Sequence, residues 1–404
     1  MFEFDSGLNW DQLSSINSLK IFNMGYPTLN KTIFHNHNLF YNKLRYYYDS
    51  NFLITKNNFF IYLNPVISLA SNDFFFRVLD NSGFGFHNNW ITLSISKGKE
   101  KWGAGDDVLL ALSENSSVYD YFFLSSNYGN VRVSYIHGFL ETIHPDINRF
   151  INARGLEWTN KKSILISLSE TIIYSGANRS IEIGYLNPIS SHLEVELNNR
   201  LTQIGDFGAN AVWQIHFEYL LKNKSRISLN YLFDEFVLDP DIQIGKEHGK
   251  AYSLKYVFPF SLRYESKLNF FLSTLYVGTP TFRHGVGSNN FVNKSIPLGW
   301  EHGSDGREHK IGFDYHIYNK SIFGFSFKVI KIGDETIQQR PYEPYKNYLK
   351  GKFPSGEILN FFSLEGNINV KIAQKLYLLS VADFRVAKSQ ITHLNFLFGI
   401  TFSF

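Results

Sequence analysis

The feature that constrains the fold most is a two-residue alternation of apolar and polar side chains. In the final segment, "ITHLNFLFGITFSF", one face carries Leu394, Phe396, Phe398, Ile400, Phe402 and Phe404. The other face carries His393, Asn395, Gly399, Thr401 and Ser403, with Leu397 as the exception. Strict alternation is typical of a β-strand with one apolar and one polar side. A strand of a soluble sandwich has the same pattern, so the rest of the chain must indicate which solvent the apolar face meets.

Similar alternating runs recur along the chain. The clearest are Trp90–Ser96, Val131–Phe139, Ser163–Thr171, Val212–Leu221, Arg226–Phe233, Tyr252–Phe258, Ile311–Tyr318, Ile322–Val329 and Leu376–Arg385. In Val212–Leu221 the second face contains His216 and Glu218, which suit a wet lumen better than a dry core, because unpaired buried charge is costly. No apolar stretch approaches the ~20 residues that a membrane-spanning helix requires. A membrane protein with this sequence must therefore be a closed barrel, which satisfies every backbone group in lipid.

The composition agrees with a membrane barrel. Aromatic residues make up 17% of the chain, with 39 Phe and 24 Tyr, yet the mean hydropathy is slightly negative. A barrel with an aromatic outer face and a polar inner face combines these properties. The net charge is +3, without long basic runs, which gives no sign of nucleic-acid binding. The chain has no cysteine, which excludes disulfides and thiol catalysis.

Short and long polar connections alternate along the sequence. Short turns are predicted at "SNYGN", "TNKK", "KNKS", "PFSL", "YNKS" and "AQK", and long segments at Asp234–Lys250, Gly278–Lys310 and Gly333–Glu357. Outer-membrane barrels have short periplasmic turns and long extracellular loops. The sequence therefore predicts an all-β fold, a transmembrane antiparallel β-barrel of about 16–18 strands at the usual spacing. We expect the barrel to span 43–404, after an irregular periplasmic or luminal segment at 1–42.

Both ends of the chain bear on localisation. The first residues, "MFEFDSGLNW", have neither the basic nor the apolar region of an export signal, so we expect an upstream piece that supplies one. The last strand, ending in Phe402 and Phe404, resembles the signal that the outer-membrane assembly machinery of bacteria reads. We expect a bacterial outer-membrane location.

An ordered set of motifs resembles one family. The segment "GKEKWGAGDDVLLALSEN" carries Trp102, Gly103, Gly105, Leu110, Leu112, Ser113 and Asn115 in a pattern similar to that of the Wzi-type capsule-assembly proteins of the bacterial outer membrane. Further matches follow in "RGLEWTNKKSILISLSETIIY", "IEIGYLNPIS", "NRLTQIGDFGANAVWQI" and "ISLNYLFDEFVLD". The likeness spans roughly Trp90–Asp239. It implies an eighteen-stranded barrel whose external face engages surface polysaccharide without enzymatic turnover.

Several aromatic and acidic residues are candidates for polysaccharide binding. They are Trp102, Asp106, Asp107, Asp234, Glu235, Trp300, Tyr342 and Tyr345. Aromatic faces stack on sugars, and carboxylates accept hydrogen bonds from hydroxyl groups. The same residues also suit structural roles. The segment "WGAGDD" could form a luminal turn, the acids could form ion pairs, and the tyrosines could belong to the aromatic girdle at the membrane interface. A luminal charge network is predicted from Arg154, Glu170, Arg200 and Asp206.

Other kinds of site have less support in the sequence. The loop Phe282–Lys310 contains His284, Glu301, His302, Asp305, Glu308 and His309, which have the residue types of a metal site, but their spacing matches neither an HExxH nor an EF-hand pattern. We therefore predict no metal, no cofactor and no catalytic residue.

The functional prediction is a non-enzymatic outer-membrane barrel that binds or organises capsular or exopolysaccharide. The expected partners are membrane lipid, polysaccharide and the assembly machinery; nucleic acid is not expected, and the protein is predicted to be a monomer. A channel for sugars or other small solutes is the main alternative. An outer-membrane hydrolase using Asp234 and Glu235 is the third.

Overall fold

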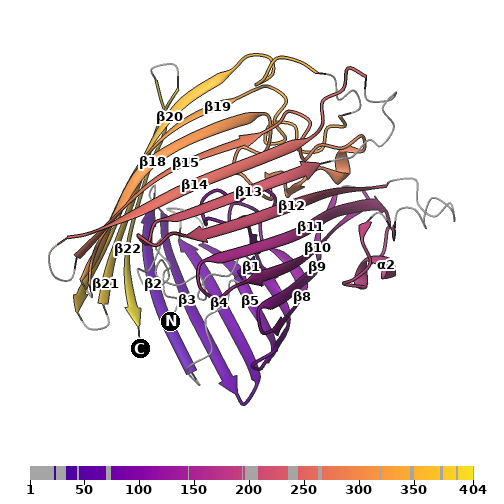
Figure 1. The fold of residues 1–404 in the computed structure, drawn as a ribbon. Helices are drawn as coiled ribbons and strands as arrows, with labels where there is room; N and C mark the ends of the chain where they lie inside the picture. Colours follow the sequence, from indigo (N-terminus) through magenta and orange to yellow (C-terminus); the bar gives the residue numbers. More distant parts are fainter. Residues whose placement is uncertain are drawn as a thin grey trace.

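The computed structural model has the shape of a barrel (Figure 1). It describes residues 22–23, 33–42, 45–69, 74–143, 145–192, 194–195, 208–234, 244–262, 266–318, 320–345, 350–373, 376–387 and 390–403. Eighteen strands form one closed antiparallel sheet, which confirms the predicted fold class. They are β2 (Ile33–Asn42), β3 (Arg45–Lys56), β4 (Phe59–Leu69), β5 (Phe74–His87), β6 (Ile91–Gly98), β8 (Tyr119–Tyr128), β9 (Val131–Ile143), β10 (Ile147–Thr159), β11 (Ile164–Ala177), β12 (Ala209–Leu220), β13 (Arg226–Asp234), β14 (Lys250–Ser261), β15 (Ser266–Val277), β18 (Gly306–Ile317), β19 (Ser321–Ile332), β20 (Leu359–Ala373), β21 (Leu376–Ala387) and β22 (Gln390–Ser403).

The last strand closes the barrel against the first. β22 pairs with β2, and Phe402 lies opposite His37 in this register. Because β2 also pairs with β3, the barrel begins at Ile33. The predicted start of the barrel at residue 43 is therefore too late. Earlier in the chain, β1 (Phe22–Asn23) pairs with β7 (Lys101–Trp102). Phe404 and the rest of segment 1–42 lie outside the described residues.

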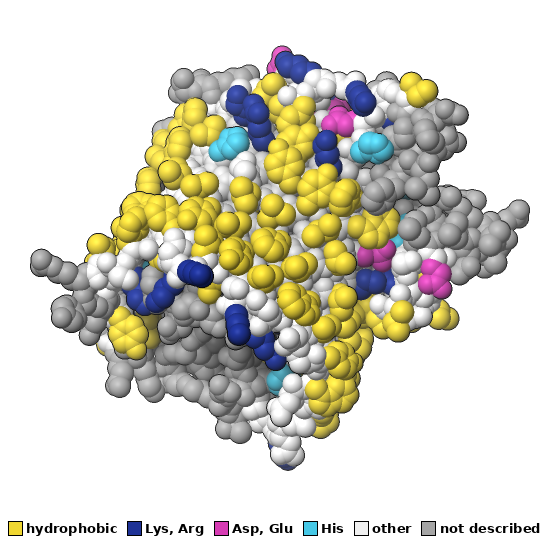
Figure 2. Space-filling model, in the orientation of Figure 1, with side chains coloured by type: hydrophobic (Ala, Val, Ile, Leu, Met, Phe, Trp, Pro, Cys, Tyr) yellow, Lys and Arg dark blue, Asp and Glu magenta, His cyan; other side chains and the backbone are white. Residues whose placement is uncertain are grey.

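The wall carries its apolar side chains on the outside. Figure 2 shows hydrophobic side chains over much of the surface that the strands form. Large exposed apolar residues occur on many strands, including Phe59, Ile61, Ile95, Leu156, Ile166, Leu168, Ile215, Leu229, Leu272, Ile311, Phe325, Phe362 and Leu364. On β12, Ile215 is exposed, whereas its neighbours His216 and Glu218 are buried. The sequence alternation thus separates a lipid-facing surface from a polar lumen.

Among the described residues, no helix is long and apolar enough to cross a membrane.

The connections differ between the two ends of the barrel. At one end they are 57–58, 88–90, 129–130, 160–163, 221–225, 262–265, 318–320 and 374–375. The other end carries the long connections 99–118, 178–208, 235–249, 278–305 and 333–358, alongside short ones. This sorting agrees with the predicted asymmetry and is typical of short periplasmic turns and long extracellular loops.

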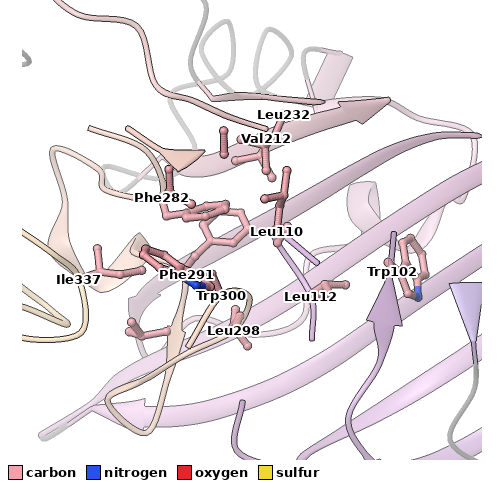
Figure 3. Close-up of a cluster of buried hydrophobic side chains, with 14 of the residues drawn as sticks. Trp102, Leu110, Leu112, Val212, Leu232, Phe282, Phe291, Leu298, Trp300 and Ile337 are labelled. Atoms are coloured by element: carbon pink, nitrogen blue, oxygen red, sulfur yellow. The ribbon is translucent and has the colours of Figure 1, made fainter. Parts of the chain in front are cut away.

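Three long connections fold together inside the barrel, and we call residues 99–118, 278–305 and 333–345 the plug. The plug contains β7, η2 (Gly287–Asn289), β16 (Val292–Asn293) and β17 (Ile296–Pro297). Its apolar side chains form one buried cluster with inward-facing residues of the wall, such as Val212 and Leu232 (Figure 3). The neighbouring long connection 178–208 contains the short helix α2 (Ile183–Leu186).

Backbone contacts hold the plug segments against one another. Ser113 N donates to Leu298 O at 2.8 Å, and Trp300 N donates to Leu110 O at 3.3 Å. A Cβ at Gly299 would lie 1.6 Å from Leu110 O, so this approach requires glycine.

A buried arginine attaches the plug to the wall. The Arg149 guanidinium, from β10, donates to the carbonyl oxygens of Ser288, Asn290 and Val292 at 2.5, 2.6 and 2.8 Å. It also pairs with Glu141 at 2.6 Å, which balances its charge. The plug is therefore bound to the wall through directed polar contacts as well as apolar packing.

Candidate functional site

The turn "WGAGDD" lies in the lumen against β12 and β13. Asn230 accepts a hydrogen bond from Ala104 N and donates one to Ala104 O, both at 2.7 Å. Glu218 accepts one from Gly105 N at 3.1 Å. Gly105 has a φ of +73°, a conformation that side chains of L-residues disfavour. The glycine-rich sequence thus permits a tight turn, and the polar inner wall fixes its position.

A pocket of about 260 Å³ lies between this turn, the rest of the plug and the wall. Its lining includes Trp300, Asn115, Ser113 and Leu109. Six carboxylates and two ammonium groups also line it: Asp106, Asp107, Glu114, Glu301, Glu308, Glu365, Lys310 and Lys328. The pocket therefore combines an aromatic side chain with many hydrogen-bond acceptors and an excess of negative charge.

Ion pairs connect one side of the pocket to the wall. Asp107 lies 2.5 Å from Lys255 Nζ on β14 and 3.0 Å from Lys310 Nζ on β18. Lys328 on β19 lies 2.5 Å from Glu365 on β20. Desolvation opposes the charge of Asp107, but the two lysines outweigh it and hold the pKa of this carboxyl below its usual range. Asp107 is therefore ionised and fixed at neutral pH.

The predicted polysaccharide-binding residues do not form a single site. Asp106, Asp107 and Trp300 meet in the pocket. Trp102 is completely buried, and its indole N–H donates to Glu100 at 3.3 Å. The proposed stacking of Trp102 on a glycan is thus corrected, since the packed indole has no exposed face.

Burial also sets the protonation of Glu100. Its carboxyl accepts hydrogen bonds from Tyr121 at 2.8 Å and from Trp102. Burial nevertheless raises the pKa of Glu100 to about 8, because these neutral donors only partly replace water. The plug consequently contains a carboxyl group that is neutral at pH 7.

The other predicted acids lie elsewhere. Asp234 is buried at the end of β13, where Oδ2 accepts a hydrogen bond from Phe282 N, so it anchors the plug and does not face the pocket. Glu235 lies outside the described residues, which leaves no described carboxylate pair at this strand end.

The two predicted tyrosines contact luminal arginines. The Tyr342 hydroxyl donates to Glu141 at 2.8 Å, and its ring centroid is 5.3 Å from the Arg149 guanidinium. The Tyr345 ring lies 4.3 Å from the guanidinium of Arg283. Neither tyrosine lines the pocket, and both pack at the plug, half-buried.

The predicted charge network is described in part. Arg154 and Glu170 are opposite each other on β10 and β11, and Arg154 Nε lies 3.1 Å from Glu170 Oε2. Arg200 and Asp206 lie outside the described residues. A more extensive network runs from strand β14 to strand β21. It connects Lys255, Asp107, Lys310, Glu365, Lys328, Glu301 and Arg385, and the sequence did not predict it. The inward face of each alternating strand could have indicated Lys310 and Lys328.

Asp305 has a structural role that its residue type, which suggested only a metal ligand, did not indicate. It is fully buried and accepts hydrogen bonds from Thr279 Oγ1 at 2.7 Å, Glu335 N at 3.1 Å and Ser355 N at 3.0 Å. It thereby joins connections 278–305 and 333–358. No sequence pattern marks this role, because its partners are 20 or more residues away.

Comparison with known proteins supports the fold by structure and not by sequence. No protein-family model matches the chain, and no curated protein matches it by sequence.

Solved outer-membrane barrels share its architecture. Wzi of Escherichia coli, an outer-membrane protein involved in group 1 capsule assembly and a carbohydrate-binding β-barrel, has a TM-score of 0.68 and 11% identity, over 92% of this chain and 85% of Wzi. OccK5 (OpdH) of Pseudomonas aeruginosa has a TM-score of 0.52 and 8% identity, over 92% and 96% of the two chains. A BenF-like porin of Pseudomonas fluorescens Pf-5 has a TM-score of 0.52 and 9% identity, over 92% and 98%. The chain is thus similar in fold to outer-membrane barrels, both carbohydrate-binding and porin-like.

Proposed function

We propose that the protein is a bacterial outer-membrane barrel that binds or organises surface polysaccharide, capsular or exopolysaccharide, without turning it over. The observation that carries this proposal is the pocket at the plug. There Asp106, Asp107 and Asn115 are exposed and supply partners for sugar hydroxyl groups. Trp300 is only 5% exposed, so it closes the floor of the pocket and offers no open face for stacking. The likeness of the fold to the carbohydrate-binding Wzi barrel supports the same function.

The plug makes binding a better proposal than transport. Its buried apolar cluster and the contacts of Arg149 fill and fix part of the lumen. A ligand that enters from the loop end would meet a floor built from Trp300 and the ion-paired Asp107. In this proposal, lipid surrounds the apolar wall, the assembly machinery recognises the closing strand with Phe402 and Phe404, and the protein acts as a monomer.

Binding to immobilised polysaccharide tests the proposal directly. Detergent-purified protein should be retained on capsular or exopolysaccharide above the level of an unrelated barrel. Asp106→Asn and Asn115→Ala should each weaken retention roughly fivefold, the effect of about 1 kcal/mol for one lost hydrogen bond. Asp146→Asn is the matched control, because Asp146 is a partly exposed acid in a short connection at the same end of the barrel and does not line the pocket. Equal retention of all variants and of the unrelated barrel would refute the proposal.

A solute channel is the second candidate function. It is favoured by the likeness to the BenF-like porin and by the charged side chains that line the lumen from β14 to β21. Planar-bilayer recording separates the two functions. A plugged barrel should pass almost no current, whereas steady conductance by the unmodified protein would favour the channel.

A further inference from the structure

We propose that Glu301, His302 and Glu308 bind one divalent transition-metal ion of the zinc class. One donor atom from each residue lies within 4.8 Å of the others. Glu301 and His302 belong to the plug, while Glu308 is on β18 of the wall. An ion at this point would cross-link the plug to the barrel. This site goes beyond polysaccharide binding, since the ion needs no sugar to bind.

His302 provides the strongest evidence for a ligand. Its side chain is only 3% exposed, and Nε2 has a long ion-pair contact with Glu301 but no hydrogen bond of good geometry with the described residues. Nε2 points toward the carboxylates, 3.3 Å from Glu301 Oε1. The rings of Trp300 and Phe361 pack edge-on against the imidazole, with ring centroids 5.0 and 5.1 Å from its centroid. This packing fixes the orientation of the imidazole. A buried imidazole nitrogen that has only this long contact is poorly satisfied, and coordination of a metal shared with Glu301 would satisfy it.

A neighbouring side chain orients each of the two carboxylates, Glu301 and Glu308. Arg385 Nη2 lies 3.2 Å from Glu301 Oε2, so the other oxygen, Oε1, faces His302. Trp300 Nε1 donates to Glu308 Oε2 at 3.1 Å. Protein metal sites commonly orient their carboxylate ligands through such outer hydrogen bonds. Arg385 and Trp300 would therefore act as positioning residues for the ion.

The surrounding charge favours a cation. Six carboxylates and two ammonium groups line the adjacent pocket. Two cations lie beside Glu301. Arg385 contacts Oε2 at 3.2 Å, and Lys328 competes for the proposed donor oxygen, with Nζ 3.9 Å from Oε1. Its closer partner is Glu365, at 2.5 Å, so Lys328 stays paired if a metal replaces the longer contact. The pocket also leaves room for water as a further ligand.

The donor types select the class of ion. One imidazole nitrogen with two carboxylate oxygens is a donor set that Zn²⁺ uses, whereas Ca²⁺ and Mg²⁺ prefer oxygen ligands throughout. The sequence predicted no metal, because the spacing of Glu301, His302 and Glu308 matches neither an HExxH nor an EF-hand pattern. The strand β18 brings Glu308 beside the loop residues, and this proximity appears only in the fold.

Calorimetric titration of the whole, chelator-treated protein in detergent tests the site with Zn²⁺ and Ca²⁺ alone. We expect one Zn²⁺ per chain, and at least tenfold weaker binding in His302→Gln and Glu308→Gln. His309→Gln is the matched control, because His309 is an exposed histidine on the same strand and should bind Zn²⁺ normally. His302→Cys should retain binding, since a thiolate can replace the imidazole.

Several outcomes would overturn the site. They are the absence of stoichiometric Zn²⁺ binding, unchanged binding in His302→Gln and Glu308→Gln, or Ca²⁺ binding as tight as Zn²⁺ binding. X-ray absorption of the Zn²⁺-loaded, unmodified protein decides the question even if the variants do not fold. It should show an imidazole and oxygen ligands at about 2.0–2.2 Å, and a spectrum without imidazole would contradict the proposal. Because no sugar is present, failure of this site leaves polysaccharide binding to be judged separately.

Discussion

The wall and the plug place the same kinds of residue in opposite environments. On β11, Leu168 is 53% exposed, while the adjacent Ser169 is buried and hydrogen-bonded to His216. In the plug, Phe291 and Leu298 are buried, as they would be in a soluble protein. The chain therefore has two separate apolar surroundings, lipid outside the wall and a small dry core inside the lumen. The following substitutions test that distinction.

The largest expected effect concerns the dry core. Phe291→Ala removes a buried ring that packs 5.2 Å from the ring of Phe282, and should destabilise the plug by about 3–5 kcal/mol. Limited proteolysis of the folded barrel in detergent should show faster cleavage within the plug. Phe362→Ala removes the same side chain from the outer face of β20 and should leave plug cleavage unchanged. Equal cleavage of both variants would show that the cluster is not a cooperative core.

The next effect concerns the lipid-facing wall. Leu168→Arg places a charge opposite the membrane interior and should cost roughly 2–4 kcal/mol near the midplane. Urea unfolding of the protein in lipid vesicles measures the loss. Ile189→Arg, at an 88% exposed position in the connection 178–208, should change stability by less than about 0.5 kcal/mol. If both variants lose the same stability, the apolar surface of β11 does not face lipid.

A smaller, pH-dependent effect is expected at Glu100. The pKa is about 8 in the folded protein and about 4.3 in an unfolded chain, so folding takes up a proton between these values. Stability should therefore fall as pH rises from about 5 to 8 and then level off. Glu100→Gln should remove much of this slope and stabilise the protein at pH 9 by about 1–3 kcal/mol.

Thermal melting between pH 5 and 9 measures the effect of Glu100. Glu114→Gln is the control, because its side chain is 62% exposed in the same connection. A melting profile of Glu100→Gln with the same slope as that of the unmodified protein would rule out this carboxyl as the source.

The smallest effect is expected at the rim of the plug. Lys101 pairs with Glu114, and their side chains are 38% and 62% exposed. Water screens such a pair, so Lys101→Gln should change stability by about 0–1 kcal/mol and less at high salt. Melting in low and high salt checks this. A loss as large as that of Phe291→Ala would mean that this contact is shielded from solvent.

The wall was predictable from the sequence to a large extent. The alternation in Val212–Leu221 assigned Ile215 outward and His216 and Glu218 inward, as the structure has them. The short turns also appeared close to their observed positions, although "PFSL" was placed early, since β14 continues to Ser261. Such features are local, because successive side chains of a strand point to opposite faces of the sheet.

The candidate site was less predictable. Asp106, Asp107 and Trp300 were identified by residue type, whereas Trp102 was wrongly expected to be available to a sugar. The burial of Trp102 depends on the contact between segments 99–118 and 278–305, which are far apart in the chain. Residue type indicates what chemistry a side chain can do, but not whether solvent reaches it.

The sequence by itself determined a closed barrel, because its strict alternation without long apolar helices leaves no other way to satisfy the backbone in lipid. The three-dimensional arrangement was needed to show that three of the long connections enter the lumen, that Asp305 joins two of them, and that Glu308 lies beside His302. The physical reason is the range of the interactions. Strand polarity is set between adjacent residues, whereas the plug depends on contacts between distant segments that no local pattern records.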